Sequence, residues 1–141
     1  MPLAFDMFSG PNAPVGKAPE WCGWRVRSID KAISAEHNLS DTEVQCKLQP
    51  EMDKAAAVMW APACETLSRA RERPVPGGMN RPRPLRDAAN VRGLPQLQSA
   101  EAKRVKEANS FCDWTWERVA AGVEEGHAHV IEKPKKNPNK S

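Results

Sequence analysis

The sequence is poor in the large side chains from which hydrophobic cores are built. Leu, Ile, Val and Phe together make up 23 of the 141 residues, about 16%, which is below the roughly 20% at which disorder becomes a serious interpretation. Disordered chains usually also carry a high net charge, and the formal charge here is only +3. Five Trp add packing volume, and 13 Pro predict long non-helical connections. We therefore expect one domain with a thin core and at least one extended loop.

Long apolar runs, a secretion signal and paired cysteines are also missing. No run reaches the roughly 18–20 apolar residues of a membrane-spanning helix, and the N-terminus has neither a basic start nor a long apolar stretch. The four Cys are scattered, without a C-x-x-C pair or a close His partner, which argues against a zinc site and a compact disulfide framework. These absences predict a protein that contacts no membrane, is not secreted and lies inside the cell, in the cytoplasm or nucleus.

Short apolar segments alternate with helical ones along the chain. The predicted strands span residues 3–8, 24–30, 43–48, 55–61 and 127–132, and the third is the weakest. Shorter helical segments are predicted at 15–22, 31–36 and 64–71. The clearest helix runs from about residue 99 to 125, with one apolar stripe formed by Val105, Ala108, Cys112, Trp116, Val119 and Val123. The alternation predicts a three-layer, Rossmann-like α/β fold with a mostly parallel sheet.

A segment rich in proline and arginine interrupts this pattern at residues 73–98. It contains five Pro and three Gly, and loops of that length within a small domain are usually functional or disordered. Arginine suits forked contacts with phosphate, so the segment predicts a nucleic-acid interface, while a solvated basic loop is the alternative. Together with two arginines of the preceding predicted helix, the candidate contacts are Arg69, Arg71, Arg73, Arg81, Arg83, Arg86 and Arg92. A basic tail follows at residues 133–141.

The carboxyl ends of parallel strands meet at one edge of a sheet, where ligands of such folds bind. This rule places Ser9–Asn12, Asp30, 62–64 and Glu132 at a common edge. Gly10 lets the backbone approach a ligand closely, and Asp30 follows it by 20 residues, the offset at which an acid commonly holds ribose hydroxyls. The alternative is a tight turn, with Asp30 capping the next helix.

Cys64 and Glu132 each follow a predicted strand. Cys64 also opens a predicted helix, whose N-terminus would favour a reactive thiolate, although most lone cysteines are buried and inert. Glu132 is either a functional carboxylate or a solvated charge at a strand end. His127 and His129 share one strand face by alternation, and no metal site is predicted there. A cysteine-dependent hydrolase is disfavoured because neither His would lie near Cys64.

Three segments resemble motifs of the DNA (cytosine-5) methyltransferases, a class I family that uses S-adenosylmethionine. The residues 6–13, read as D-M-F-S-G-P-N-A, resemble the family's D-L-F-S-G-x-G-G. The residues 62–68, read as P-A-C-E-T-L-S, resemble P-P-C-Q-x-F-S, and 132–134, read as E-K-P, resemble E-N-V or E-N-P. Their order and approximate spacing agree with the front part of the family's catalytic domain.

The resemblance implies a specific chemistry. Cys64 would add to C6 of a cytosine flipped out of DNA, making C5 nucleophilic enough to take a methyl group, and Glu132 would hydrogen-bond N3 and the exocyclic amine. The S-adenosylmethionine site would be lined by Phe8, Ser9, Gly10, Pro11, Asn12, Asp30 and Pro62. RNA is the alternative substrate.

The resemblance also implies an incomplete domain. Residues 1–141 would form a single partial methyltransferase-like domain, with about five strands and an open sheet edge that a partner chain could complete. Such a truncated chain could be inactive. The alternative function is a non-catalytic fragment that binds nucleic acid, or another partner, through the arginine-rich loop.

Overall fold

The computed structural model describes residues 1–62, 66, 77 and 83–132. Contacts between Cα atoms divide these residues into two compact units. The first unit holds the described residues 1–62 and 110–132, and the second holds 66, 77 and 83–109. The elements, in chain order, are β1 (Leu3–Met7), α1 (Lys17–Trp21), β2 (Arg25–Ile29), the 3-10 helix η1 (Ala35–His37), α2 (Thr42–Met52), β3 (Ala57–Trp60), α3 (Ser99–Glu124) and β4 (Ala128–Ile131).

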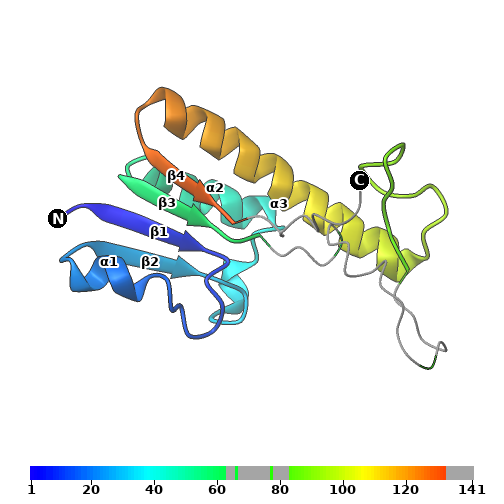
Figure 1. The fold of residues 1–141 in the computed structure, drawn as a ribbon, viewed down its shortest axis with the longest axis horizontal. Helices are drawn as coiled ribbons and strands as arrows, with labels where there is room; N and C mark the ends of the chain where they lie inside the picture. The colour runs from blue at the N-terminus through cyan, green and yellow to red at the C-terminus, as the bar shows by residue number, and fades with distance from the viewer. Residues whose placement is uncertain (63–65, 67–76, 78–82, 133–141) are drawn as a thin grey trace. The chain divides into compact units, whose positions relative to one another are not determined.

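The first unit is built on one four-stranded sheet in which all neighbouring strands are parallel (Figure 1). The strand order is β2-β1-β3-β4. All five residues of β1 are buried, because this strand lies between two others and is covered on both faces. The predicted parallel α/β sheet is therefore confirmed, and the order is consistent with a Rossmann-like fold.

The register divides the strand residues between two faces. Phe5, Arg27 and Val58 lie side by side on one face, while Asp6 and Ser28 lie side by side on the other. The first face packs against helices: Arg27 lies over the Phe5 ring, 5.9 Å from its centroid, and forms an ion pair with Glu51 of α2.

Trp60, a fully buried side chain of β3, contacts both α3 and β4. Its ring meets Trp114 of α3 edge-on at 5.7 Å, and its Nε1–H donates to Nδ1 of His129 on β4 at 3.0 Å. A few large aromatic rings therefore build a core that the scarce aliphatic residues could not fill.

The predicted strand at 43–48 is wrong, because these residues belong to helix α2. Asp41 caps that helix by accepting a hydrogen bond from the Glu43 N–H at 2.9 Å. Gln45 fills a core position, where its Nε2 donates to the Leu39 carbonyl at 2.8 Å. Because Gln45 is polar and Pro50 lies inside the helix, the sequence does not show the regular apolar spacing from which a helix is usually predicted. The sheet thus has four strands rather than five within the described residues.

The long helix predicted at 99–125 is confirmed as α3, but two of the six residues of its predicted stripe are exposed. Val105 and Ala108 are buried, whereas Trp116 is 54% and Val123 is 61% exposed. Past the helix, Gly126 adopts φ 80° and donates to the Val123 carbonyl, while the His127 N–H donates to the Gly122 carbonyl. This pair of bonds is the Schellman motif, for which glycine is suited.

The other short helical predictions have mixed outcomes. The helix predicted at 15–22 is reduced to Lys17–Trp21, and the turn predicted at 31–36 becomes η1 at Ala35–His37. The helix predicted at 64–71 lies outside the described residues, apart from Thr66. None of the helices that the structure describes combines the length and apolarity needed to cross a bilayer.

Candidate functional site

The carboxyl edge of the sheet brings together most of the residues predicted for a ligand site. Phe8 follows β1, Asp30 follows β2, Ala61 and Pro62 follow β3, and Glu132 follows β4. Because all four strands are parallel, these positions share one edge (Figure 1). The chain passes from β1 outward to β2 and then returns to the other side of β1 as β3. The edge between β1 and β3 is therefore the topological switch point, where open α/β sheets bind ligands.

The loop after β1 is attached to the end of β2. Gly10 N–H donates to Asp30 Oδ2 at 2.9 Å, and Ala32 N–H donates to Asp30 Oδ1 at 2.7 Å. The Phe8 N–H also donates to the Ile29 carbonyl, at 2.8 Å. Asp30 thus fixes both its own turn and the neighbouring loop. The tight turn of the structural alternative is present, but the next helix, η1, is capped by Ser34 and not by Asp30. A carboxylate oxygen can accept more than one hydrogen bond, so these contacts leave capacity for a ligand hydroxyl.

Left-handed backbone conformations are concentrated in this same loop. Gly10 has φ 72°, and two residues that carry side chains, Phe8 and Ala13, have φ 62° and 41°. Ala13 therefore has a backbone conformation that glycine adopts freely and that a residue with a Cβ adopts with strain. Strain of this kind clusters at ligand-binding loops.

Asp6, in the middle of β1, is a functional candidate that sequence reasoning missed. Its side chain is buried, and its Oδ2 accepts a hydrogen bond from the Gly16 N–H at 3.0 Å. Burial raises the pKa of Asp6, the Gly16 hydrogen bond partly lowers it, and the charge of Asp30 raises it again. An acid within an otherwise apolar strand is the signal that could have found it. Asp6 and Asp30 therefore hold the two ends of the β1–α1 loop, at Gly16 and Gly10.

The backbone of Glu132 is bonded to the end of β3, the strand that Pro62 follows. Its N–H donates to the Trp60 carbonyl at 2.8 Å, and its side chain is exposed. Pro62 is half-buried, two residues beyond Trp60. Cys64 lies outside the described residues, so the relation between the predicted nucleophile and Glu132 stays a prediction.

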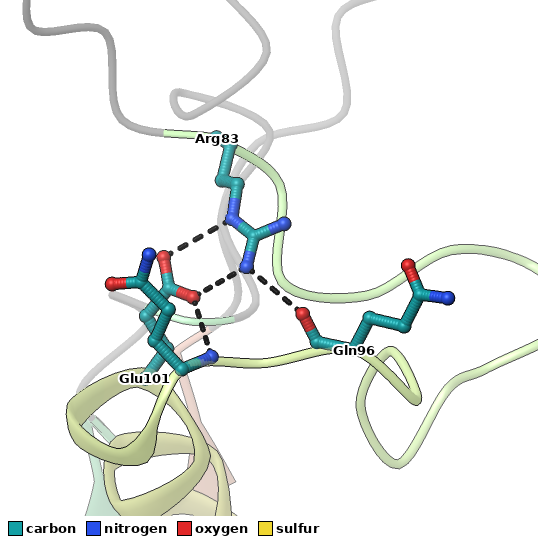
Figure 2. A network of polar contacts seen from close by, with 4 residues as sticks. Arg83, Gln96 and Glu101 are labelled. Atoms are coloured by element: carbon teal, nitrogen blue, oxygen red, sulfur yellow. Dashed lines mark hydrogen bonds and ion pairs between the residues drawn. The ribbon is translucent and has the colours of Figure 1, made fainter.

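The described arginines of the predicted nucleic-acid interface make contacts within the second unit. Figure 2 shows Arg83, whose Nε and Nη2 donate to the Glu101 carboxylate at 3.2 and 2.6 Å, with a further bond from Nη2 to the Gln96 carbonyl at 3.2 Å. The Asn109 side chain donates to the Arg92 carbonyl at 2.9 Å. Arg69, Arg71, Arg73 and Arg81 lie outside the described residues.

Arg86 donates hydrogen bonds to three different residues. Its Nη1 donates to the Val91 carbonyl at 2.7 Å and to Asn109 Oδ1 at 2.8 Å, and its Nη2 donates to Thr66 Oγ1 at 3.1 Å. These bonds tie the loop and the first half of α3 together. Any phosphate contact by Arg86 would compete with them.

Replacing Arg86 with alanine is expected to lower the free energy of local opening of the loop at 83–97 by about 2 kcal/mol, because three acceptors lose a charged donor. Amide hydrogen exchange of that loop measures the effect. The control is Lys103→Ala, which removes an exposed basic side chain from α3. Equal protection in the two variants would contradict a structural role for Arg86.

No group of three His, Cys, Asp or Glu residues within 1–62, 66, 77 and 83–132 could hold a metal ion. Comparisons of the chain with protein-family models, with curated proteins and with solved structures find no match. The fold defines an α/β protein with a parallel sheet of order 2-1-3-4, and its function has to be inferred from the residues at the carboxyl edge.

Proposed function

We propose that this chain binds S-adenosylmethionine at the carboxyl edge of its sheet and is a DNA cytosine-5 methyltransferase-like protein. The observation that carries the proposal is the bond between the Gly10 N–H and Asp30 Oδ2, which places an acid beside a left-handed loop at the switch point of a parallel sheet. The methyltransferase motif falls on this loop.

The chemistry of this edge suits an adenosyl ligand. The Asp30 carboxylate has capacity to accept ribose hydroxyls in addition to its two backbone bonds. Phe8, Ser9 and Gly10 would line one side of the cofactor, with Pro11 and Asn12 further along the loop and Pro62 on the neighbouring strand. Asn12 and Ala13 replace glycines of the family motif, so the loop would approach the cofactor less closely than in the family.

The transfer step is proposed from the sequence resemblance. S-adenosylmethionine supplies an electrophilic methyl group bonded to a positively charged sulfur. The Cys64 thiolate would form a bond to C6 of cytosine, which shifts an electron pair to C5 and makes that carbon the nucleophile. Transfer of the methyl group to C5 would break its bond to sulfur and leave a neutral thioether. Loss of the C5 proton to solvent would then return the electron pair to the ring and break the Cys64–C6 bond, which regenerates the thiolate. Glu132 would hold the base through N3 and the exocyclic amine. Its place at the end of β4, bonded through its backbone to Trp60, supports this role because Trp60 lies four residues before Cys64.

Cofactor binding is the first test. Isothermal titration with S-adenosylmethionine should show saturable binding by the wild type, and Asp30→Ala should weaken it by about tenfold or more, because a lost charged acceptor costs upward of about 1.4 kcal/mol. Asp41→Asn alters another carboxylate that accepts a backbone N–H, at the start of α2, and is the matched control. Absence of wild-type binding, or equal weakening by both variants, would contradict the proposed site.

Methyl transfer is the second test. Transfer of a labelled methyl group to cytosine-containing DNA should be lost in Cys64→Ser, while binding of S-adenosylmethionine stays unchanged. Equal, nonzero transfer by the two proteins would exclude Cys64 as the nucleophile. Salt-sensitive binding of DNA or RNA without any cofactor binding would instead favour the alternative, a non-catalytic nucleic-acid-binding fragment.

A further inference from the structure

The outward face of α3 in the first unit carries apolar side chains that the sheet does not use. Trp116 is 54% and Val123 is 61% exposed, and Ala120 between them is also exposed. Their spacing of four and three residues places them in one row, which we call the Trp116 row. The opposite face of the helix, with Phe111, Trp114 and Thr115, is buried. The Trp116 row is therefore additional to the face that makes the core.

Two acids lie beside the Trp116 row. Glu117 and Glu124 are exposed and are separated by seven residues, so they follow one line along the same helix. The single Lys or Arg among residues 110–126 is Arg118, whose Nη1 donates to Asp53 Oδ1 at 3.0 Å and whose side chain is only 16% exposed. The outward face of this half of α3 is thus both apolar and negatively charged.

The position of Glu124 opposes the stability of the helix itself. The C-terminus of a helix carries partial negative charge, so basic side chains are favourable in the last turn and acidic ones are unfavourable. The last turn of α3 contains no basic residue, and Glu124 and Glu125 lie at its end. A cationic partner would relieve this unfavourable charge. The stability of α3 therefore does not explain why acidic side chains lie at its C-terminal end.

We infer that the Trp116 row and its neighbouring acids form a docking surface for a lysine- or arginine-rich amphipathic segment of another protein. An exposed indole provides a broad apolar contact and a cation–π partner, and tryptophan is frequent among residues that dominate binding energy. The carboxylates of Glu117 and Glu124 complement the positive charges of such a segment and set its orientation. Neither a cofactor nor a nucleic acid takes part, so the inference is independent of the proposed function.

The test uses a fluorescein-labelled peptide of leucine and lysine in a helical repeat as the probe, with fluorescence anisotropy as the readout. Wild-type protein should bind it saturably, and an otherwise identical leucine–glutamate peptide should not bind. The double variant Glu117→Lys/Glu124→Lys should weaken binding at least tenfold, and Trp116→Ala about fivefold, since both groups contribute. The controls are Glu20→Lys/Glu36→Lys, which reverses two acids outside α3, and Trp21→Ala, which removes a tryptophan that is 84% exposed on α1.

The controls decide between a specific surface on α3 and general attraction of a cationic peptide to any exposed carboxylates. Unchanged affinity in both controls, with retained circular dichroism in every variant, supports the docking surface. Equal weakening in the control and α3 charge variants overturns it, as does absence of wild-type binding. Self-association that Trp116→Ala abolishes, measured by sedimentation without peptide, would also overturn it and identify a second copy as the occupant.

Discussion

Replacing Gly122 with alanine is expected to destabilise the first unit by about 2 kcal/mol, although alanine is the better helix former by about 1 kcal/mol. Gly122 lies in α3 against the imidazole of His129 on β4. A Cβ added there would lie 2.9 Å from both Cδ2 and Cε1 of His129 and closer still to Nε2. Real Cβ atoms do not approach other atoms so closely, so the ring or the helix would have to move.

The ring cannot move without loss of another contact. His129 Nδ1 accepts the hydrogen bond from Trp60 Nε1 at 3.0 Å, and the two rings are stacked with an interplanar angle of 14°. Trp60 is fully buried, so a displaced imidazole would leave its indole N–H without an acceptor. An unsatisfied buried donor costs about 1–3 kcal/mol, which outweighs the gain in helix propensity.

Urea unfolding followed by circular dichroism measures the change, and a double-mutant cycle with His129→Ala isolates its cause. In the His129→Ala background the clash is absent, so Gly122→Ala should become stabilising, by about 1 kcal/mol. Ala120→Gly, at an exposed position of α3, measures the difference in helix propensity between alanine and glycine without the clash. If Gly122→Ala stabilises the protein even when His129 is present, the prediction is wrong and the helix shifts freely away from β4.

The same contact explains why the long helix was predictable but its buried face was not. Helix length follows from local signals, including the acid at Glu101 and the glycine at Gly126. The buried face is decided by shape. Gly122 lies inward where His129 of β4 leaves no space for a side chain, and Thr115 is also buried, while Trp116 and Val123 lie outward. Hydrophobicity alone assigns Trp116 to the core, and close packing against β4 reverses that assignment.

The site was predictable where chain topology alone determines it. Parallel strands bring Phe8, Asp30 and Glu132 to one edge whatever their side chains do, and the offset between Gly10 and Asp30 corresponds to a real hydrogen bond. Asp6 could not be assigned in this way, because its importance lies in a bond to the Gly16 backbone ten residues away. Nothing in residue spacing indicates which backbone N–H a buried carboxylate will meet.

Two replacements of Asp6 are expected to differ in stability at neutral pH. Asp6→Asn keeps an oxygen that can accept from the Gly16 N–H but removes a buried negative charge that lies near Asp30, so it should be more stable than the wild type. Asp6→Leu leaves the same N–H without an acceptor and should be less stable than Asp6→Asn by about 1–3 kcal/mol. Urea unfolding of the three proteins measures both differences.

The pH dependence separates the charge from the hydrogen bond. Because burial raises the pKa of Asp6 in the folded state above its ordinary value of 3.8, the unfolded chain loses this proton first as the pH rises. The wild type therefore loses stability, relative to Asp6→Asn, as the pH rises from 3.8 through the folded-state pKa, and the two proteins converge below 3.8. The difference between Asp6→Asn and Asp6→Leu should stay constant over the same range, since neither side chain titrates.

A constant difference in stability between wild type and Asp6→Asn would mean that burial does not penalise the charge. Equal stability of the Asn and Leu variants would mean that the Gly16 N–H finds another acceptor, and Asp6 would then not hold this end of the loop.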